Sequence, residues 1–119
     1  MHATVHIISR EPLEYQQIAE IMEPYCEENV YSFNPETQEY TTPDPYPQFT
    51  WDYWDQRDPA MFENPKDCFI LIDPDGYCIA RKWWNGKTHV DQTKKFEDFC
   101  REHGDEWKGC YLQELDIHW

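Results

Sequence analysis

The chain has 119 residues and a formal net charge of −14, from 24 Asp plus Glu against 10 Lys plus Arg. That length fits a single domain, residues 1–119, which can bury a core without disulfides. The acidity argues against direct nucleic-acid binding, because affinity for phosphates depends on Lys and Arg. The 6 Phe, 6 Trp and 8 Tyr argue against disorder, since disordered acidic chains contain few aromatic residues.

The acidic residues are concentrated in the amino-terminal half of the chain. Residues 11–66 contain 13 acidic and 2 basic side chains, a net charge of −11, whereas residues 67–119 contain 11 and 7. We therefore expect the amino-terminal half to present a negative surface, which would attract a basic protein surface over long range. Solubility is the alternative explanation of the same excess.

The cysteines predict a reduced protein. Their number is odd, none forms a C-x-x-C pair, and they are Cys26, Cys68, Cys78, Cys100 and Cys110. Free cysteine in a periodic apolar segment behaves as a small hydrophobic residue. The sequence also shows no signal peptide and no apolar run of transmembrane length. A cytoplasmic protein that does not contact a membrane is therefore expected.

The first part of the chain predicts a strand followed by a helix. Residues 3–9 are rich in β-branched side chains and alternate between two faces, as in a half-buried strand. A helix is expected from Pro12, ending or kinking at Pro24, with a further turn through Glu28. Its buried stripe comprises Ile18, Ile21, Met22 and Tyr25.

Residues 29–66 predict an irregular insert, because six prolines exclude long helices from it. Within the insert, residues 49–54 (FTWDYW) alternate, which predicts a short strand with Phe49, Trp51 and Tyr53 on one side. Two roles are open for these aromatic residues. They complete the core, since exposed aromatic patches are rare, or they face a partner.

The most apolar stretch, Cys68–Trp84, predicts a β-hairpin. Its middle is Asp73-Pro74-Asp75-Gly76, in which Pro74 presets φ, Asp73 accepts a backbone hydrogen bond and Gly76 tolerates positive φ. This combination predicts a type I turn closed by a glycine bulge between two antiparallel strands. The turn is a better explanation of the two aspartates than a calcium loop, which needs further ligands that are missing.

A second helix and a last strand are predicted after the hairpin. The helix covers roughly 89–103, with Thr88 and Asp91 as a capping box, Glu97 and Arg101 as an ion pair, and Gly104 as its end. The stripe that we expect to be buried comprises Phe96, Phe99, Cys100 and His103. Residues 110–119 alternate again, with Leu115, Ile117 and Trp119 on one face of the expected strand.

This order of elements predicts an α+β fold of the ferredoxin-like type, β-α-β-β-α-β. Four strands would form one antiparallel sheet, and both helices would cover the same face of it. The Pro- and aromatic-rich insert at 29–66 would follow the first helix. The fold alone does not define a function, because many unrelated activities use it.

No metal, cofactor or catalytic site is predicted. The five His residues are scattered, and no Cys and His have the spacing of zinc ligands. Cys100 and His103 share a helical face, but residues on a core stripe more often pack than react. Carboxylate chemistry has many candidate residues and no distinctive pair.

The predicted partner-binding site combines the acidic helix with the aromatic insert. Trp and Tyr anchors surrounded by charged residues are typical of protein interfaces. The predicted residues are Glu20, Glu23, Glu27, Glu28, Trp51, Asp52, Tyr53, Trp54, Asp55 and Asp58, with Asp44 nearby in the same insert.

The stretch Trp51-Asp52-Tyr53-Trp54 resembles a Trp-Asp-aromatic-aromatic stretch in small acidic proteins of phages and mobile elements. The resemblance covers four residues, and Asp55-Gln56-Arg57-Asp58 follows where those proteins have Gly-Gly-Arg-Trp. In size and charge the chain is also similar to anti-CRISPR inhibitors. These similarities imply a non-enzymatic inhibitor, a nucleic-acid mimic that docks carboxylates on the basic groove of a nucleic-acid-binding protein.

Two other functions remain open from the sequence. One is a small enzyme that uses cysteine or carboxylate chemistry in a cleft between the insert and the sheet. The other is a homo-oligomeric regulatory domain that associates through strand edges or exposed aromatic residues. The sequence leaves the oligomeric state open.

Overall fold

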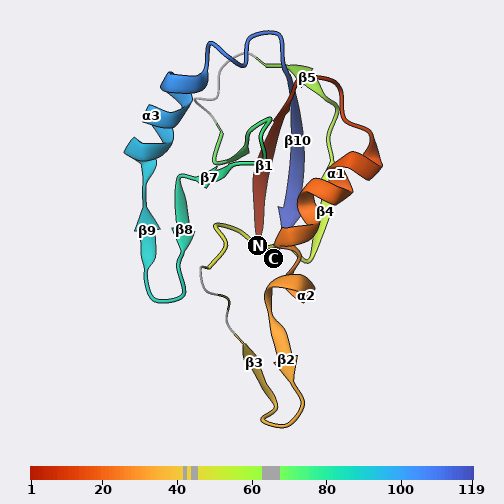
Figure 1. Cartoon of the computed structure of the whole chain (residues 1–119), viewed down its shortest axis with the longest axis vertical. Helices are drawn as coiled ribbons and strands as arrows, with labels where there is room; N and C mark the ends of the chain where they lie inside the picture. Colours follow the sequence, from red (N-terminus) through yellow and green to blue (C-terminus); the bar gives the residue numbers. More distant parts are fainter. Residues whose placement is uncertain (42, 44–45, 63–67) are drawn as a thin grey trace.

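The computed structural model describes residues 1–41, 43, 46–62 and 68–119, and Figure 1 shows their arrangement. A central sheet has the strand order β4-β10-β1-β6-β7, with β5 also pairing with β10. Its strands are β1 (His2–Ser9), β4 (Tyr53–Gln56), β5 (Ala60–Met61), β6 (Ile70–Ile72), β7 (Cys78–Ala80) and β10 (Tyr111–His118). Two separate hairpins are formed by β2 (Ser32–Asn34) with β3 (Glu39–Thr41) and by β8 (Lys82–Trp84) with β9 (His89–Asp91).

Strand β1 lies at the centre of the sheet. It pairs antiparallel with β10 along its whole length, from His2 opposite His118 to Ser9 opposite Tyr111. On its other edge β1 pairs with β6 in parallel, beginning at Val5 opposite Ile70. The sheet is therefore mixed.

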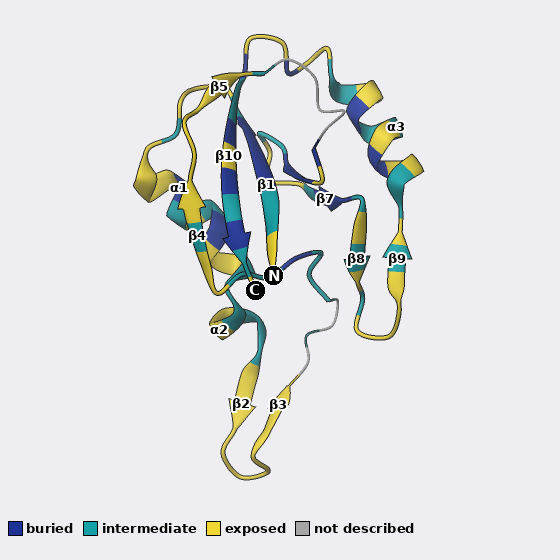
Figure 2. Ribbon diagram, turned by 180° about the vertical axis from the view of Figure 1, so that it is seen from behind, coloured by how far each residue is buried: buried dark blue, intermediate teal, exposed yellow. Residues whose placement is uncertain are grey.

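The two main helices cover opposite faces of the sheet. Ile18 and Met22 of α1 (Tyr15–Met22) pack in one cluster with Val5 and Ile7. In the second cluster, Phe96 of α3 (Thr93–His103) packs with apolar residues of three strands. The strand residues of that second cluster are Ile8, Leu71 and Ile79. Figure 2 shows buried residues on the central strands β1 and β10, whereas the edge strand β4 is mostly exposed.

The ferredoxin-like prediction is wrong, although the structure is α+β. The predicted fold needs an antiparallel sheet with both helices on one face, whereas this sheet is mixed and covered on both faces. Consecutive residues Ile70, Leu71 and Ile72 are all buried, as expected for a strand that contacts apolar layers on both sides. Such a continuous apolar run, rather than an alternating one, is the sequence signal of two covered faces.

The first helix is shorter than predicted and begins at Tyr15 rather than Pro12. The Gln17 Oε1 atom accepts a hydrogen bond from the Glu14 N–H at 2.8 Å, which fixes the start of the helix. Pro24 ends it as expected, within a 3-10 turn, η1 (Glu23–Tyr25). A further short helix, α2 (Glu27–Val30), follows.

The insert is more regular than predicted. Besides β4 and β5 it contains the β2–β3 hairpin, whose strand residues are all exposed and which projects from the body in Figure 2. The strand predicted at residues 49–54 is shifted, because β4 begins only at Tyr53. Phe49 is buried, whereas Trp51 forms an isolated parallel bridge with Cys26. Asp44 lies outside the described residues.

The predicted turn at residues 73–76 is confirmed. The Asp73 carboxylate accepts hydrogen bonds from the N–H groups of Asp75, at 2.9 Å, and Tyr77, at 2.8 Å. Gly76 has φ of +86°, in the region that favours glycine. The strands on either side are shorter than expected, because Lys82–Trp84 leaves the central sheet to pair with β9.

The second helix begins at Thr93, four residues later than predicted, because residues 89–91 form β9. The Asp91 carboxylate accepts hydrogen bonds from both the N–H and the hydroxyl of Thr93. The predicted Glu97–Arg101 pair is wrong: Glu97 pairs with Arg81, and Arg101 pairs with Asp98. The expected buried positions Phe96 and Cys100 do face the core.

The β8–β9 hairpin is held against the insert by a close glycine contact. Gly86 has φ of +94°, and a Cβ atom there would lie 2.9 Å from the Tyr46 ring. We expect Gly86→Ala to lower the free energy of unfolding by about 2 kcal/mol or more, because it adds crowding to backbone strain. Denaturant unfolding measures the change.

Gly76→Ala is the matched control, since Gly76 also has positive φ but no atom within 4 Å of an added Cβ. Gly76→Ala should lower the free energy of unfolding by about 1 kcal/mol, because it adds backbone strain without crowding. Equal losses in the two variants would show that the hairpin does not depend on the Tyr46 contact.

Candidate acidic binding surface

Carboxylates of the helical segment form the first part of the predicted site. Glu20 lies on α1, Glu23 on η1, and Glu27 and Glu28 on α2. Glu20, Glu23 and Glu28 are exposed, and Glu27 is half-buried. Their positions follow from the apolar stripe of α1, which faces the sheet and leaves the acidic residues outside.

Strand β4 and the loop after it form the second part. β4 is an edge strand of the central sheet, and Asp55 and Asp58 are exposed on it and just beyond it. Asp55 lies directly opposite Asp116 of β10. Two carboxylates at opposed positions repel each other, which costs stability in the free protein.

Trp51 joins these two parts. Its indole N–H donates a hydrogen bond to the Met22 carbonyl at 2.7 Å, and its backbone bonds to Tyr25 and Glu27 at 3.0 Å. The Trp54 ring lies 5.2 Å from the Tyr15 ring of α1. The structure therefore brings the predicted helical and aromatic residues side by side, as α1 and β4 also appear in Figures 1 and 2.

The aromatic residues of the insert divide between core and surface. Trp51 and Trp54 are half-buried and pack against the core cluster beneath α1. Tyr53 is 48 % exposed and Tyr15 is 66 % exposed, so each offers a ring to a partner. Because neighbouring residues of a strand point to opposite faces, Tyr53 and Asp55 lie on the face away from Trp54.

The acidic residues of the two halves differ in their ion pairs. Of the eleven described carboxylates in residues 11–66, none pairs with a described Lys or Arg, and one, Asp52, contacts a histidine. Of the ten described in residues 68–119, six pair with Lys or Arg and two more contact a histidine. The charge of the amino-terminal half is therefore not neutralised within the described part of the chain.

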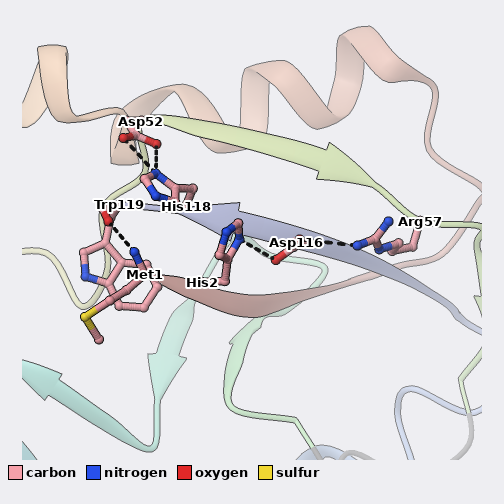
Figure 3. A network of polar contacts seen from close by, with 7 residues as sticks. All are labelled: Met1, His2, Asp52, Arg57, Asp116, His118 and Trp119. Carbon is pink, nitrogen blue, oxygen red and sulfur yellow. Dashed lines mark hydrogen bonds and ion pairs between the residues drawn. The ribbon is translucent and has the colours of Figure 1, made fainter.

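Asp52 belongs to a polar network at the ends of β1 and β10, shown in Figure 3. Its carboxylate contacts the His118 Nδ1 atom at 2.7 and 2.9 Å, and this hydrogen bond lowers the pKa of Asp52. Asp116 is shared between His2, at 3.4 Å, and Arg57, at 3.3 Å. Among the predicted site residues, Asp52 therefore has a structural partner, whereas Asp55 and Asp58 keep free carboxylates within the described residues.

Sequence reasoning missed a buried histidine on β1. His6 is only 8 % exposed, and its Nε2 atom lies 3.2 Å from the Glu114 Oε1 atom on the neighbouring strand. Burial lowers the pKa of His6 from its ordinary value of 6.5, and the Glu114 carboxylate partly opposes that shift. The sequence signal that could have predicted this burial is the position of His6 between apolar residues of the expected strand.

The histidine pKa gives a test of this geometry. NMR titration should place the pKa of His6 below 6.5, and Glu114→Gln should lower it further by removing the carboxylate that favours imidazolium. Since the unfolded chain then binds more protons, His6 contributes stability above about pH 6.5 that is lost as pH falls through its folded pKa.

Glu106→Gln is the control for that titration, because Glu106 contacts His103 and not His6. It should leave the His6 pKa where it was. A His6 pKa above 6.5, or one that rises in Glu114→Gln, would contradict the burial of this ring.

Cysteine chemistry receives no support from this geometry. No disulfide joins the five cysteines, all of which lie in the described ranges. Burial raises the pKa of Cys100 to about 11 and that of Cys78 to about 12, so neither thiol is ionised near neutral pH. His103 contacts Glu106 and the rings of Phe99 and Trp107 rather than acting as a base for Cys100.

The described residues were also compared with the requirements of a metal site and of a membrane-spanning helix. Among the residues that the structure describes, no three His, Cys, Asp or Glu are grouped to hold a metal ion. Within those same ranges, no helix is both long and apolar enough to cross a membrane.

No family model, curated protein or solved structure matches the chain. Its class is therefore given by its architecture: a mixed sheet with helices on both faces and an acidic flank whose described carboxylates are not neutralised.

Proposed function

We propose that this is a non-enzymatic binding protein of the cytoplasm that docks its acidic flank on the basic surface of a nucleic-acid-binding protein. The flank wraps around the β4 edge of the sheet: Glu20, Glu23, Glu27, Glu28 and Tyr15 lie on the α1 side, Tyr53 and Asp55 lie on the opposite face, and Asp58 lies just beyond β4. In this role the protein competes with nucleic acid for the basic groove and so inhibits its partner.

The difference in ion pairing between the two halves carries this proposal. Solubility requires net charge but does not require that charge to remain unpaired on one flank while the other half is neutralised locally. An unpaired set of carboxylates attracts a basic surface and steers its approach. Exposed aromatic rings beside the carboxylates supply apolar contact area at the interface.

The opposed pair Asp55 and Asp116 supports the same function. Arg57 contacts Asp116 and offsets part of the repulsion, while Asp55 has no ion-pair partner among the described residues. A cationic side chain from a partner would relieve that repulsion. Part of the stability lost in the free protein would thus be recovered on binding.

Neutralising the helical carboxylates tests the proposal directly. The protein is used to capture a partner from cell lysate at low salt, and the bound proteins are eluted with a salt gradient. We expect the variant with Glu20, Glu23, Glu27 and Glu28 changed to Gln to bind the purified partner roughly tenfold more weakly. Duplex DNA or RNA should also displace the partner from the unmodified protein.

The matched control has the same change of charge in the other half, with Asp75 and Asp105 changed to Asn and Glu102 and Glu106 changed to Gln. It should keep nearly full affinity, since the carboxylates of the flank are intact. An affinity that is insensitive to salt, or equal losses in the two variants, would overturn the proposal.

Asp55→Asn should separate stability from binding. Removing one of two opposed carboxylates should raise the free energy of unfolding by about 0.5 kcal/mol and at the same time weaken partner binding. Denaturant unfolding and titration calorimetry measure the two effects. Asp58→Asn is the control: Asp58 has no opposed carboxylate in the described sheet, so it should weaken binding without the gain in stability.

A further inference from the structure

Two histidines stand side by side where β1 begins and β10 ends. His2 of β1 lies directly opposite His118 of β10. The next pair along, Met1 and Trp119, exchanges two backbone hydrogen bonds of 3.1 Å. Because hydrogen-bonded and non-hydrogen-bonded pairs alternate along an antiparallel ladder, His2 and His118 form a non-hydrogen-bonded pair, the kind whose side chains lie closer together. Both imidazoles therefore project from the same face of the sheet as direct neighbours.

The two imidazole rings are at the separation that a shared metal ion requires. Their centroids lie 5.0 Å apart. A zinc–nitrogen bond of about 2.0–2.1 Å and a tetrahedral angle at the metal place the centroids of two ligating imidazoles roughly 5 Å apart. The side chains of His2 and His118 are 55 % and 32 % exposed. An ion can therefore reach both rings from solvent.

In each ring the nitrogen nearer to the backbone, Nδ1, contacts a carboxylate, as Figure 3 shows. The His118 Nδ1 atom lies 2.7 and 2.9 Å from the Asp52 oxygens, and the His2 Nδ1 atom lies 3.4 Å from Asp116. An ionised carboxylate only accepts hydrogen bonds, so it favours the proton on Nδ1 and leaves the lone pair of the neutral ring on Nε2. Histidines that bind metal ions usually donate their other ring N–H to a carboxylate in this way.

The His118 ring is also restrained by a neighbour on its other side. Tyr53 lies opposite His118 on β4, and the two rings stack at 5.0 Å with an angle of 13° between their planes. His118 is thus enclosed between Tyr53 and His2, and its Nδ1 atom is held by Asp52. A side chain that is already ordered loses less conformational entropy when it binds a ligand.

The other three histidines, all within the described ranges, lack this combination. His103 has a similar carboxylate contact, since its Nδ1 atom lies 3.3 Å from Glu106, but its ring stacks on Trp107. His6 is buried, and His89 packs against an indole ring. His103 is therefore a matched control: it has the carboxylate contact without a second imidazole beside it.

From these observations we propose that His2 and His118 bind one divalent transition-metal ion through their Nε2 atoms, with water completing its coordination. Imidazole ligands suit copper and zinc, and Cu²⁺ should bind more tightly than Zn²⁺. Mg²⁺ and Ca²⁺ prefer oxygen ligands and should not compete. The ion links the start of β1 to the end of β10. The site adjoins Tyr53 of the acidic flank but needs no protein partner, so it is independent of the proposed function.

A titration of the full chain, without an affinity tag, with Zn²⁺ tests the site. In ¹⁵N–¹H correlation spectra of the imidazole rings, Zn²⁺ should shift the Nε2 signals of His2 and His118 together, because both nitrogens bind the same ion. The shifts should saturate at one ion per chain. The signals of His89 and His103 should stay in place, and Mg²⁺ at the same concentration should move none of the four.

His2→Asn and His118→Asn should each weaken Cu²⁺ binding by roughly tenfold or more in calorimetry, because a single imidazole cannot chelate. His103→Asn should leave the affinity unchanged. If one of the two site variants does not fold, the other variant and the Zn²⁺ spectra of the unmodified protein remain decisive. Zn²⁺ shifts that are absent or equal at all exposed histidines, or unchanged Cu²⁺ affinity in a folded site variant, would overturn the proposal.

Discussion

The pairing of β1 with β10 on one edge and β6 on the other organises the molecule. Because β1 is central, its side chains reach both faces of the sheet, and each face needs its own apolar cover. α1 supplies one cover through Ile18, and α3 supplies the other through Phe96. The helix that covers the first face must then expose its remaining side, which carries Glu20, while Glu23, Glu27 and Glu28 lie on the helical turns that follow it. The acidic flank is in this sense a consequence of two-sided burial.

Local features were predictable from the sequence, whereas the assembly was not. Local sequence patterns were enough to predict three features: the Asp73–Gly76 turn, the buried stripe at Ile18 and Met22, and the last strand. Each depends on residues close together in the chain. The order of strands depends on pairing between distant segments. The subset β1, α1, β6, β7, α3 and β10 follows the ferredoxin-like order of elements, yet β1 pairs with β6 in parallel, and the insert adds β4 and β5 to the sheet. The apolar run at Ile70–Ile72 was the one sign that both faces are covered.

For the candidate sites too, the sequence predicted the residue types but not how the fold brings them together. The charge of the flank is visible in the composition, but whether its described carboxylates find ion-pair partners depends on where the fold places Arg57 and the lysines. A cleft of about 900 Å³ beside the start of β1 could not be predicted either, because it is lined by β1, the insert and the β8–β9 hairpin, which are far apart in the chain. From the sequence His6 resembles an ordinary strand residue; only the structure shows its contact with Glu114 and its burial.

The β2–β3 hairpin has a practical consequence. Its strand residues are exposed, and the rings of Phe33 and Tyr40 contact each other. A two-stranded ribbon of this kind adds little to the global free energy of folding. An epitope or fluorophore inserted at its tip would therefore report on complexes of this protein with little disturbance to the core, since the hairpin projects away from the central sheet in Figure 1.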